Sequence, residues 1–495
     1  MLGSTKAFTT EDIASGVTAS IESVLKQVKL PSTSIQSVMI GTTQFTNAFV
    51  ERRRLAPVAV IRLGLPASAS LPPLTGWPRA LVEAIGSNVF QLHGGSEIHG
   101  GDISALDEAG LRTALRQIQR RGITSIAISS IFSPVNPAME KRAKAIVEEV
   151  YPAASVTLAS DIGRVGLIER ENAAVMNASL SELSRQVVGA FRASLSDLDM
   201  QCPFFISQND GTLMSADYVE RYPVLTFASG PTNSMRGAAY LSGEEDAVVI
   251  DIGGTTSDIG VLQKGFPRES SVPVDIGGVR TNFRMPDVLA LGLGGGSIVH
   301  TDGELRIGPD SVGFRLSRDA LVFGGRVLTT TDIAVAAGHA TIGDVSRVRG
   351  KIPQALIDAV TTKVHEMLEA GIDRVKSNSK DVTAILVGGG SVLVSRRLRG
   401  VSRLIVPERS AEANAIGAAI AQVGGEADRI FLYSDVGRER ALSIARAEAC
   451  DKAIKAGGKP DTVKVIDVEE IPLGYGSGGA VRVRTKVVAD LVMDA

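Results

Sequence analysis

The chain has 495 residues, of which 44% are hydrophobic and 21% are charged. This length and composition predict a globular protein of about three domains and exclude a disordered or fibrous chain. Its 52 basic residues nearly balance its 54 acidic ones, which excludes the strong positive field that recruits nucleic acids or anionic membranes. We therefore expect small molecules or other proteins as partners, with no nucleic acid and no membrane.

Cysteine usage and hydropathy indicate the compartment. The two cysteines, Cys202 and Cys450, lie far apart without CxxC spacing, so neither a disulfide framework nor a zinc cluster is indicated. No apolar run reaches about 18 residues, and the N-terminus lacks the basic-then-apolar layout of a signal peptide. These features predict a soluble, cytoplasmic protein.

Short apolar runs alternate with helical periodicity through the first part of the chain. SVMI (37–40) precedes GTTQFTN, VAVIRL occupies 58–63, and ITSIAISSIF (123–132) follows a helical pattern. This alternation predicts an α/β sheet layer. A helical stripe from Ile168 to Leu198 then predicts one long helix of about 45 Å, enough to cross between domains.

A second α/β region follows that helix. Its predicted elements are FFIS (204–207), VVIDIGGTTSDIGVL (248–262), LGLGGGSIV (291–299), a helix from about 354 to 377 and AILVGGGSV (384–392). The segment AEANAIGAAIAQV (411–423) is dense in alanine and glycine, which predicts a helix that packs closely on another backbone. The tail predicts a small α+β module, and two successive α/β regions suggest a duplicated fold.

The stretch VVIDIGGTTSDIGVL carries the strongest functional signal. Two strand patterns flank its turn, whose glycines let backbone N–H groups converge on an anion without interference from Cβ. The predicted phosphate cradle comprises Gly253, Gly254, Thr255 and Thr256. Asp251 and Asp258, at the two strand ends, are candidates to hold a magnesium-bound water or to orient a nucleophile. The alternative is an ordinary hairpin with two solvated acids.

Other nucleotide and hydrolase motifs fit less well. The GxGxxG fingerprint requires a helix after the loop, whereas the residues after GGTT alternate as a second strand. The Walker pattern GxxxxGK[ST] is absent from the sequence. Neither a GxSxG elbow nor a reactive cysteine setting occurs, so covalent hydrolase chemistry has little support.

Three further loops are candidates for ligand binding. The glycine triplets 294–296 and 388–390 each follow an apolar run, and each is compatible with a phosphate or nucleoside loop or with a plain turn. Asp287 precedes the first triplet as a possible polar anchor. In GTTQFTN, Thr42 and Thr43 precede a helix whose N–H groups suit an anionic or carbonyl ligand. Their alternative role is an N-cap.

Seven segments in the same order resemble the hydantoinase A / 5-oxoprolinase family of the actin-like ATPase superfamily. They are GTTQFTNAFVERR, IERENAAVMNASL, SQNDGTLMSA, ASGP, DIGGTTSDIGVL, LGLGGGSI and GGGS. The resemblance runs from about residue 5 to the C-terminus. It implies a duplicated ribonuclease-H-like fold with a nucleotide cleft between two lobes. The implied domains are an N-terminal hydantoinase/oxoprolinase lobe (1–166), an ATPase-like lobe (167–425) and the α+β module (426–495).

The resemblance also implies a reaction and roles for residues. The family uses ATP and Mg²⁺ to phosphorylate the amide oxygen of a cyclic amide, such as a hydantoin or 5-oxoproline, and then opens the ring with water. Asp251 and Asp258 would organise metal or water, with Asp251 as the metal ligand, and residues 253–256 would hold phosphate. The remaining implied cofactor residues are Gly294, Gly295, Gly296, Gly388, Gly389 and Gly390, the last three bordering the nucleoside. The implied substrate-side residues are Thr42, Thr43 and Asn47.

Two alternatives to a cyclic-amide hydrolase stay open. One is the ATP-using subunit of an acetone-carboxylase-like complex, and the other is a catalytically silent binding or assembly module. The implied partners are a hydantoinase B-like subunit or fused second domain, in a homo- or hetero-oligomer.

The two ends of the chain depart from the family pattern. Family members usually open with a DxGGTxTD-like phosphate loop, whereas MLGSTKAFTTEDIASG resembles the segment after that hairpin. We therefore expect the first phosphate loop to be missing, through a fragment, a mispredicted start or a lobe that a partner completes. The C-terminus resembles the point where some relatives continue into a fused domain.

Overall fold

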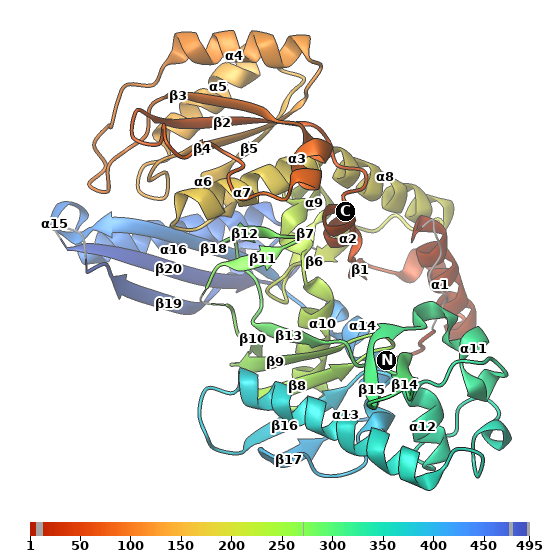
Figure 1. Ribbon diagram of the computed structural model, residues 1–495. Helices are drawn as coiled ribbons and strands as arrows, with labels where there is room; N and C mark the ends of the chain where they lie inside the picture. The colour runs from red at the N-terminus through yellow and green to blue at the C-terminus, as the bar shows by residue number, and fades with distance from the viewer. Residues whose placement is uncertain (6–12, 271, 475–478, 493–495) are drawn as a thin grey trace. The chain divides into compact units, whose positions relative to one another are not determined.

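The computed structural model describes residues 1–5, 13–270, 272–474 and 479–492. The chain forms two compact units, each built from three separate segments (Figure 1). Unit 1 comprises Met1–Pro31, Ala228–Glu269 and Pro286–Ala421, and unit 2 comprises Ser32–Phe227, Ser270–Met285 and Gln422–Ala495. Both units combine sheets and helices, which confirms the predicted α/β class. The units interleave along the sequence, whereas the expected domains 1–166, 167–425 and 426–495 are consecutive ranges.

Unit 1 is built on a mixed sheet with the order β10-β9-β8-β16-β17, and β13 also pairs with β9. The strands are β8 (Ala247–Ile252), β9 (Ser257–Gln263), β10 (Phe266–Pro267), β13 (Val288–Leu291), β16 (Val382–Val387) and β17 (Val401–Ile405). Antiparallel pairing joins β8 to β9, whereas β8, β16 and β17 run parallel. An antiparallel meander followed by parallel strands is the strand order of a ribonuclease-H-like half. The predicted hairpin at 248–262 is therefore confirmed.

The remaining elements of unit 1 cover this sheet or extend it. Its helices are α1 (Ile13–Val28), α10 (Ser229–Ser242), α11 (Leu316–Asp319), α12 (Thr330–Ala336), α13 (Gln354–Val375) and α14 (Ala413–Ala419). A separate hairpin consists of β14 (Ser297–His300) and β15 (Arg306–Ser311). The predicted helix at about 354–377 corresponds to α13.

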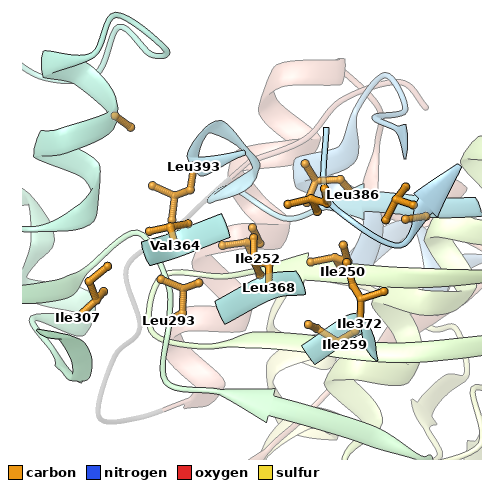
Figure 2. Close-up of a cluster of buried hydrophobic side chains, with 14 of the residues drawn as sticks. Ile250, Ile252, Ile259, Leu293, Ile307, Val364, Leu368, Ile372, Leu386 and Leu393 are labelled. Atoms are coloured by element: carbon orange, nitrogen blue, oxygen red, sulfur yellow. The ribbon is translucent and has the colours of Figure 1, made fainter. Parts of the chain in front are cut away.

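Strand β8 sends alternate side chains to opposite faces of the sheet, as the strand period of two requires. Val248, Ile250 and Ile252 are buried in a cluster with residues of α12 and α13, including Leu368 and Ile372 (Figure 2). Ala247 and Val249 instead pack against residues of α10 and α14 on the other face. Asp251 has the same parity as Ala247 and Val249, so it lies on the α10 face.

Helices α10 and α14 pack so closely that their backbones are in contact. A Cβ on Gly417 of α14 would collide with the carbonyl of Asn233, and a Cβ on Gly237 of α10 would collide with the carbonyl of Ala413. Only glycine allows this spacing. The close packing predicted for 411–423 is confirmed, although the helix itself is confined to Ala413–Ala419.

Unit 2 contains two main sheets. The parallel sheet, in the order β3-β2-β4-β5, consists of β2 (Val58–Leu65), β3 (Asn88–His93), β4 (Ser125–Ser130) and β5 (Ser155–Leu158). The second, in the order β1-β6-β7-β18-β20-β19, consists of β1 (Val38–Ile40), β6 (Phe204–Ser207), β7 (Leu213–Ser215), β18 (Val423–Leu432), β19 (Lys464–Pro472) and β20 (Ala480–Ala489). A small hairpin comprises β11 (Val274–Ile276) and β12 (Val279–Thr281).

Ten helices of unit 2 are described. They are α2 (Gln44–Glu51), α3 (Arg79–Ile85), α4 (Glu108–Arg120), α5 (Ala138–Val150), α6 (Ala159–Ile162), α7 (Leu167–Ser179), α8 (Ser181–Asp197), α9 (Ala216–Arg221), α15 (Tyr433–Val436) and α16 (Arg438–Lys455). No helix in the described part of the chain is long and apolar enough to cross a membrane.

The single long helix predicted from 168 to 198 is wrong, because the structure breaks it into α7 and α8 at Leu180. In an unbroken helix the Ser179 carbonyl would accept the N–H four residues ahead. It accepts the Ala56 N–H instead, at 2.8 Å. The Ser179 hydroxyl also donates to the Met176 carbonyl, so a tertiary contact and a side chain together end α7.

The tail, expected as a separate α+β module, extends a sheet of unit 2. β18 pairs with β20 along its whole length and meets β7 at Val423, opposite Leu213. Helix α16 packs on β18 and β20 through alanines that include Ala445 and Ala449. The tail therefore contributes to the core of unit 2.

Candidate functional site

The hairpin of β8 and β9 places the two predicted acids side by side. Asp251 lies directly opposite Asp258 in the antiparallel register. The turn closes through a hydrogen bond of 2.9 Å from the Gly253 N–H to the Thr256 carbonyl. Directly opposed Cβ atoms are typically about 5 Å apart, so both carboxyl groups share the α10 face of the sheet.

Three successive carbonyl groups of the hairpin tip accept hydrogen bonds from neighbouring loops. The Ile252 carbonyl accepts the N–H of Gly390 at 2.8 Å, and the Gly253 carbonyl accepts that of Gly295 at 3.0 Å. The Gly254 carbonyl accepts the N–H of Gly296 at 2.6 Å. Two neighbouring loops thus satisfy three successive acceptors of the tip.

The N–H groups of the tip remain available as a consequence. Gly254, Thr255 and Thr256 are exposed, and their backbone N–H groups donate to no residue in the described ranges. Successive free N–H groups with the carbonyls turned away form an anion-binding concavity. This geometry is compatible with a phosphate at residues 254–256. The Gly253 N–H, which the sequence prediction also included in the cradle, instead donates to the Thr256 carbonyl.

Both glycine triplets pack directly against the hairpin tip, with no room for a Cβ at several of their positions. A Cβ on Gly294 would lie 2.6 Å from the Thr255 nitrogen, and a Cβ on Gly390 would collide with Ile252. A Cβ on Gly388, which has φ +88°, would collide with the Asp251 carboxylate. Close packing therefore requires glycine at these positions. Within the second triplet Gly389 is exposed beside the tip.

Hydroxyl groups fix the first triplet in place. Thr330 and Thr331, in the first turn of α12, donate to the carbonyls of Gly294 at 2.5 Å and Gly295 at 2.6 Å. The Ser257 hydroxyl donates to the Leu293 carbonyl at 2.6 Å. All three hydroxyl-bearing residues are buried. The loop behind the tip is therefore held from both α12 and β9.

Burial and mutual repulsion perturb the two acids. Burial raises the pKa of Asp251, and the Ser234 hydroxyl of α10 partly offsets this effect. Burial, followed by the charge of Asp251, raises the pKa of Asp258 to about 6. Asn414 of α14 donates to the Ser234 hydroxyl at 3.3 Å. Helices α10 and α14 therefore both position the hydroxyl group that lies beside Asp251.

The acid pair has the properties of a cation site. Like charges directly opposite in a sheet are unfavourable, yet neither acid forms an ion pair with any described basic residue. Among the described residues no three His, Cys, Asp or Glu side chains are grouped to hold a metal on their own. Two carboxylates suit Mg²⁺, which keeps several waters and binds jointly to carboxylates and phosphates. The residues present therefore fit Mg²⁺ bound with a phosphate ligand.

The three predicted substrate-side residues come from the other unit. Thr42, Thr43 and Asn47 belong to unit 2, at the start of α2, whereas the hairpin belongs to unit 1. The Thr42 hydroxyl accepts the Gln44 N–H at 3.2 Å, whereas Thr43 makes no capping bond through its side chain. Thr43 and Asn47 are exposed. Their substrate-side role stays a prediction.

Asp287 has a structural partner. Its carboxylate accepts two hydrogen bonds from Arg268, at 2.7 and 3.0 Å. This ion pair, together with the Arg268 bond to the Val375 carbonyl, ties the start of β13 to the end of α13. Asp287 thus anchors that strand and makes no described contact with the hairpin tip.

Sequence reasoning missed four residues that support the site. Ser234 lies in ASGPTNS, which was recognised only as a turn-rich loop, and Ser257 follows the GGTT turn directly. Thr330 and Thr331 lie in TTTD, whose capping box between Thr329 and Asp332 is a visible helix-start signal. That signal predicts a helix start but does not reveal which loop the hydroxyl groups contact.

Comparison with solved structures defines the class of fold. The crystal structure of ATP-dependent caprolactamase from Pseudomonas jessenii superposes on 97% of this chain and 83% of its own, with a TM-score of 0.75 at 20% identity. The two chains therefore share a fold, an α/β architecture with several sheets.

Sequence comparison defines the family. The model described as Hydantoinase/oxoprolinase matches residues 170–346, and that of the Hydantoinase/oxoprolinase N-terminal region matches residues 1–151. The chain belongs to the hydantoinase/oxoprolinase family, which confirms the resemblance seen in the motifs. Relatives that match the chain include a caprolactamase subunit, 5-oxoprolinases and subunits of carboxylases.

Two curated relatives are 30% identical to this chain. Caprolactamase subunit alpha of Pseudomonas jessenii matches over 306 residues, which are 60% of this chain and 42% of the relative. The acetophenone carboxylase gamma subunit of Aromatoleum aromaticum matches over 252 residues, which are 48% of this chain and 34% of the relative. The chain thus spans less than half the length of these two relatives.

Proposed function

We propose that this chain uses ATP and Mg²⁺ to open a cyclic amide, of the hydantoin, 5-oxoproline or lactam type, through phosphorylation of the amide oxygen. The observation that carries the proposal is the hairpin tip, where three free N–H groups adjoin two unpaired acids. ATP with Mg²⁺ supplies the phosphoryl group that makes the oxygen of an unreactive amide a leaving group.

The residues of the chain contribute binding and electrostatics. The N–H groups of Gly254, Thr255 and Thr256 would hold phosphate oxygens, since preorganised donors stabilise charge without rearranging. Asp251 and Asp258 would hold the metal, Asp251 directly, or orient the attacking water. The glycine triplets would set the shape of the phosphate and nucleoside site through their contacts with the tip. Thr42, Thr43 and Asn47 are proposed to face the substrate.

A second candidate function is the ATP-using subunit of a carboxylase. It is favoured by the 30% identity to the acetophenone carboxylase gamma subunit. The two named relatives are subunits, and the chain spans less than half of each, so we propose that it works with a second subunit or domain. A reaction that consumes ATP also fits the cytoplasm.

Phosphate release from Mg-ATP tests these proposals. We expect release by the purified chain, with its partner where one copurifies, to rise when 5-oxoproline, hydantoin or caprolactam is added. Stimulation by a ketone with bicarbonate and not by any amide would favour the carboxylase. Binding of Mg-ATP with no release under any condition would contradict both and favour a silent binding module.

A further inference from the structure

Phe314 is the most exposed aromatic side chain of the described residues. It is 76% exposed and lies in the short 3-10 helix Gly313–Arg315 of unit 1. Single exposed hydrophobic residues are common on protein surfaces and need no explanation by themselves. The position of Phe314 beside the hairpin tip is what distinguishes it.

The segment that carries Phe314 is tied to the loops of the candidate site. The Val312 N–H donates to the Gly296 carbonyl at 2.9 Å, and the Ser311 hydroxyl approaches the Gly254 carbonyl at 3.5 Å. Val312 is buried. Phe314 therefore follows a segment fixed to both the tip and its backing loop, so its exposure does not reflect a detached loop.

The distance between Phe314 and Thr255 allows one ligand to contact both residues. A Cβ on Gly313 would lie 4.0 Å from the Thr255 hydroxyl oxygen. Because consecutive Cα atoms are about 3.8 Å apart, the Cα of Phe314 lies within about 10 Å of that hydroxyl. Gly313 has φ +54°, a left-handed conformation that favours glycine and fixes the direction in which the chain enters Phe314.

We propose that Phe314 is a stacking residue for the flat base of the nucleotide whose phosphates occupy the hairpin tip. This inference rests on the proposed function, because it takes a phosphate at residues 254–256 as its starting point. A nucleotide carries its base one ribose and a short phosphate chain away, which suits an aromatic ring at this range. Aromatic faces bind bases by stacking with little preference between them.

Binding measurements with and without a base test the inference. We would titrate Mg-ATP and Mg-tripolyphosphate into the wild-type chain and into Phe314→Ala by calorimetry. Loss of a stacked base should weaken ATP binding roughly 5- to 100-fold and leave tripolyphosphate binding unchanged. Phe323→Ala is the matched control, because Phe323 is a second exposed phenylalanine of unit 1, at 38%. We expect that variant to bind both ligands normally.

A fluorescence variant provides an independent signal. The chain has one tryptophan, Trp77, which is buried in unit 2. Phe314→Trp adds an exposed indole at the proposed stacking position, so ATP should quench the new emission whereas tripolyphosphate should not. This variant retains an aromatic face and should bind ATP at least as tightly as the wild type.

The outcomes separate the inference from the proposed function. If the wild type binds neither ligand, the proposed function fails and the inference fails with it. If the wild type binds both and Phe314→Ala binds ATP normally, only the inference is overturned. Weaker binding of a cyclic amide with normal ATP binding would also overturn it, because Phe314 would then face the ring of the substrate.

Discussion

At the residue scale, the pairing of Asp251 with Asp258 is the most informative feature. A stable sheet gains nothing from two acids in opposition, and both carboxyl groups are partly buried without an ion pair among the described residues. Perturbed acids beside a concave anion site are typical of functional positions. This arrangement costs stability, and the proposed cation site gives the pair a function.

Replacement of Asp251 should separate activity from stability. We expect Asp251→Asn to abolish ATP-dependent turnover, because it removes the charge proposed to hold the metal. Its free energy of unfolding should equal or exceed that of the wild type, since the repulsion of Asp258 is relieved. Phosphate release and urea unfolding would measure the two effects. Normal turnover in this variant would contradict the assigned role.

The raised pKa of Asp258 predicts a dependence of stability on pH. An acid whose pKa rises on folding, here from 3.8 to about 6, binds its proton more tightly in the folded chain. Its contribution to stability is therefore present below about pH 4 and is lost as the pH rises through 6. Relative to Asp258→Asn, the metal-free wild type should lose roughly 2 kcal/mol between pH 4 and 7. If the free energies of unfolding of the two proteins changed equally between pH 4 and 7, this prediction would be wrong.

At the element scale, glycines decide which elements can meet. The hairpin tip, the two glycine triplets and the pair α10–α14 all pack at distances that exclude a Cβ. The same glycines bring Asp251, Ser234 and the tip together. Packing between elements therefore requires glycine here, independently of the proposed phosphate binding.

Helix α14 offers a direct test of this packing. Gly417→Ala should destabilise unit 1 by about 1–3 kcal/mol or more, because the new Cβ would collide with the Asn233 carbonyl of α10. Gly189→Ala, in α8, is the control, since nothing lies within 4 Å of its Cβ position. It should be neutral or slightly stabilising. Thermal unfolding would compare the two, and equal midpoints would contradict the packing argument.

At the scale of the whole molecule, each unit is assembled from segments far apart in the sequence. In unit 2 one buried ion network joins all three segments. Asp210 contacts Arg284 and, at 3.2 Å, Lys486, and Arg284 also contacts Glu426 at 2.5 Å. The nearby cations Lys486 and Arg284 hold the pKa of Asp210 well below its usual range against the opposing effect of burial. The carboxylate therefore stays charged inside the unit.

Removal of the Asp210 carboxylate should destabilise the association of the three segments of unit 2. We expect Asp210→Ala to lower the free energy of unfolding by about 3–5 kcal/mol, because it removes a buried carboxylate that contacts both Arg284 and Lys486. Asp217→Ala is the control, since its side chain is 87% exposed in its pair with Arg192 and should matter little. Urea unfolding and limited proteolysis would report the change. Equal stability of the two variants would contradict the linking role.

Local patterns in the sequence determined several of the elements and indicated the candidate site. The α/β class, the hairpin at 248–262, helix α13 and the close packing at 411–423 all follow from periodicity or composition within short windows. The motifs also identified the family, and the GGTT turn indicated the hairpin tip whose exposed N–H groups are proposed to bind an anion. Each of these features depends on neighbours along the chain.

Contacts between distant segments decided the rest. The sequence could not show that the Ala56 N–H would donate to the Ser179 carbonyl and so end α7, or that the tail would join the sheet of β6 and β7. Nor could it show that the triplets 294–296 and 388–390 would satisfy the carbonyls of the tip. A hydrogen bond between remote segments produces no periodic pattern in the sequence, because hydrophobic periodicity indicates only which face of an element is buried.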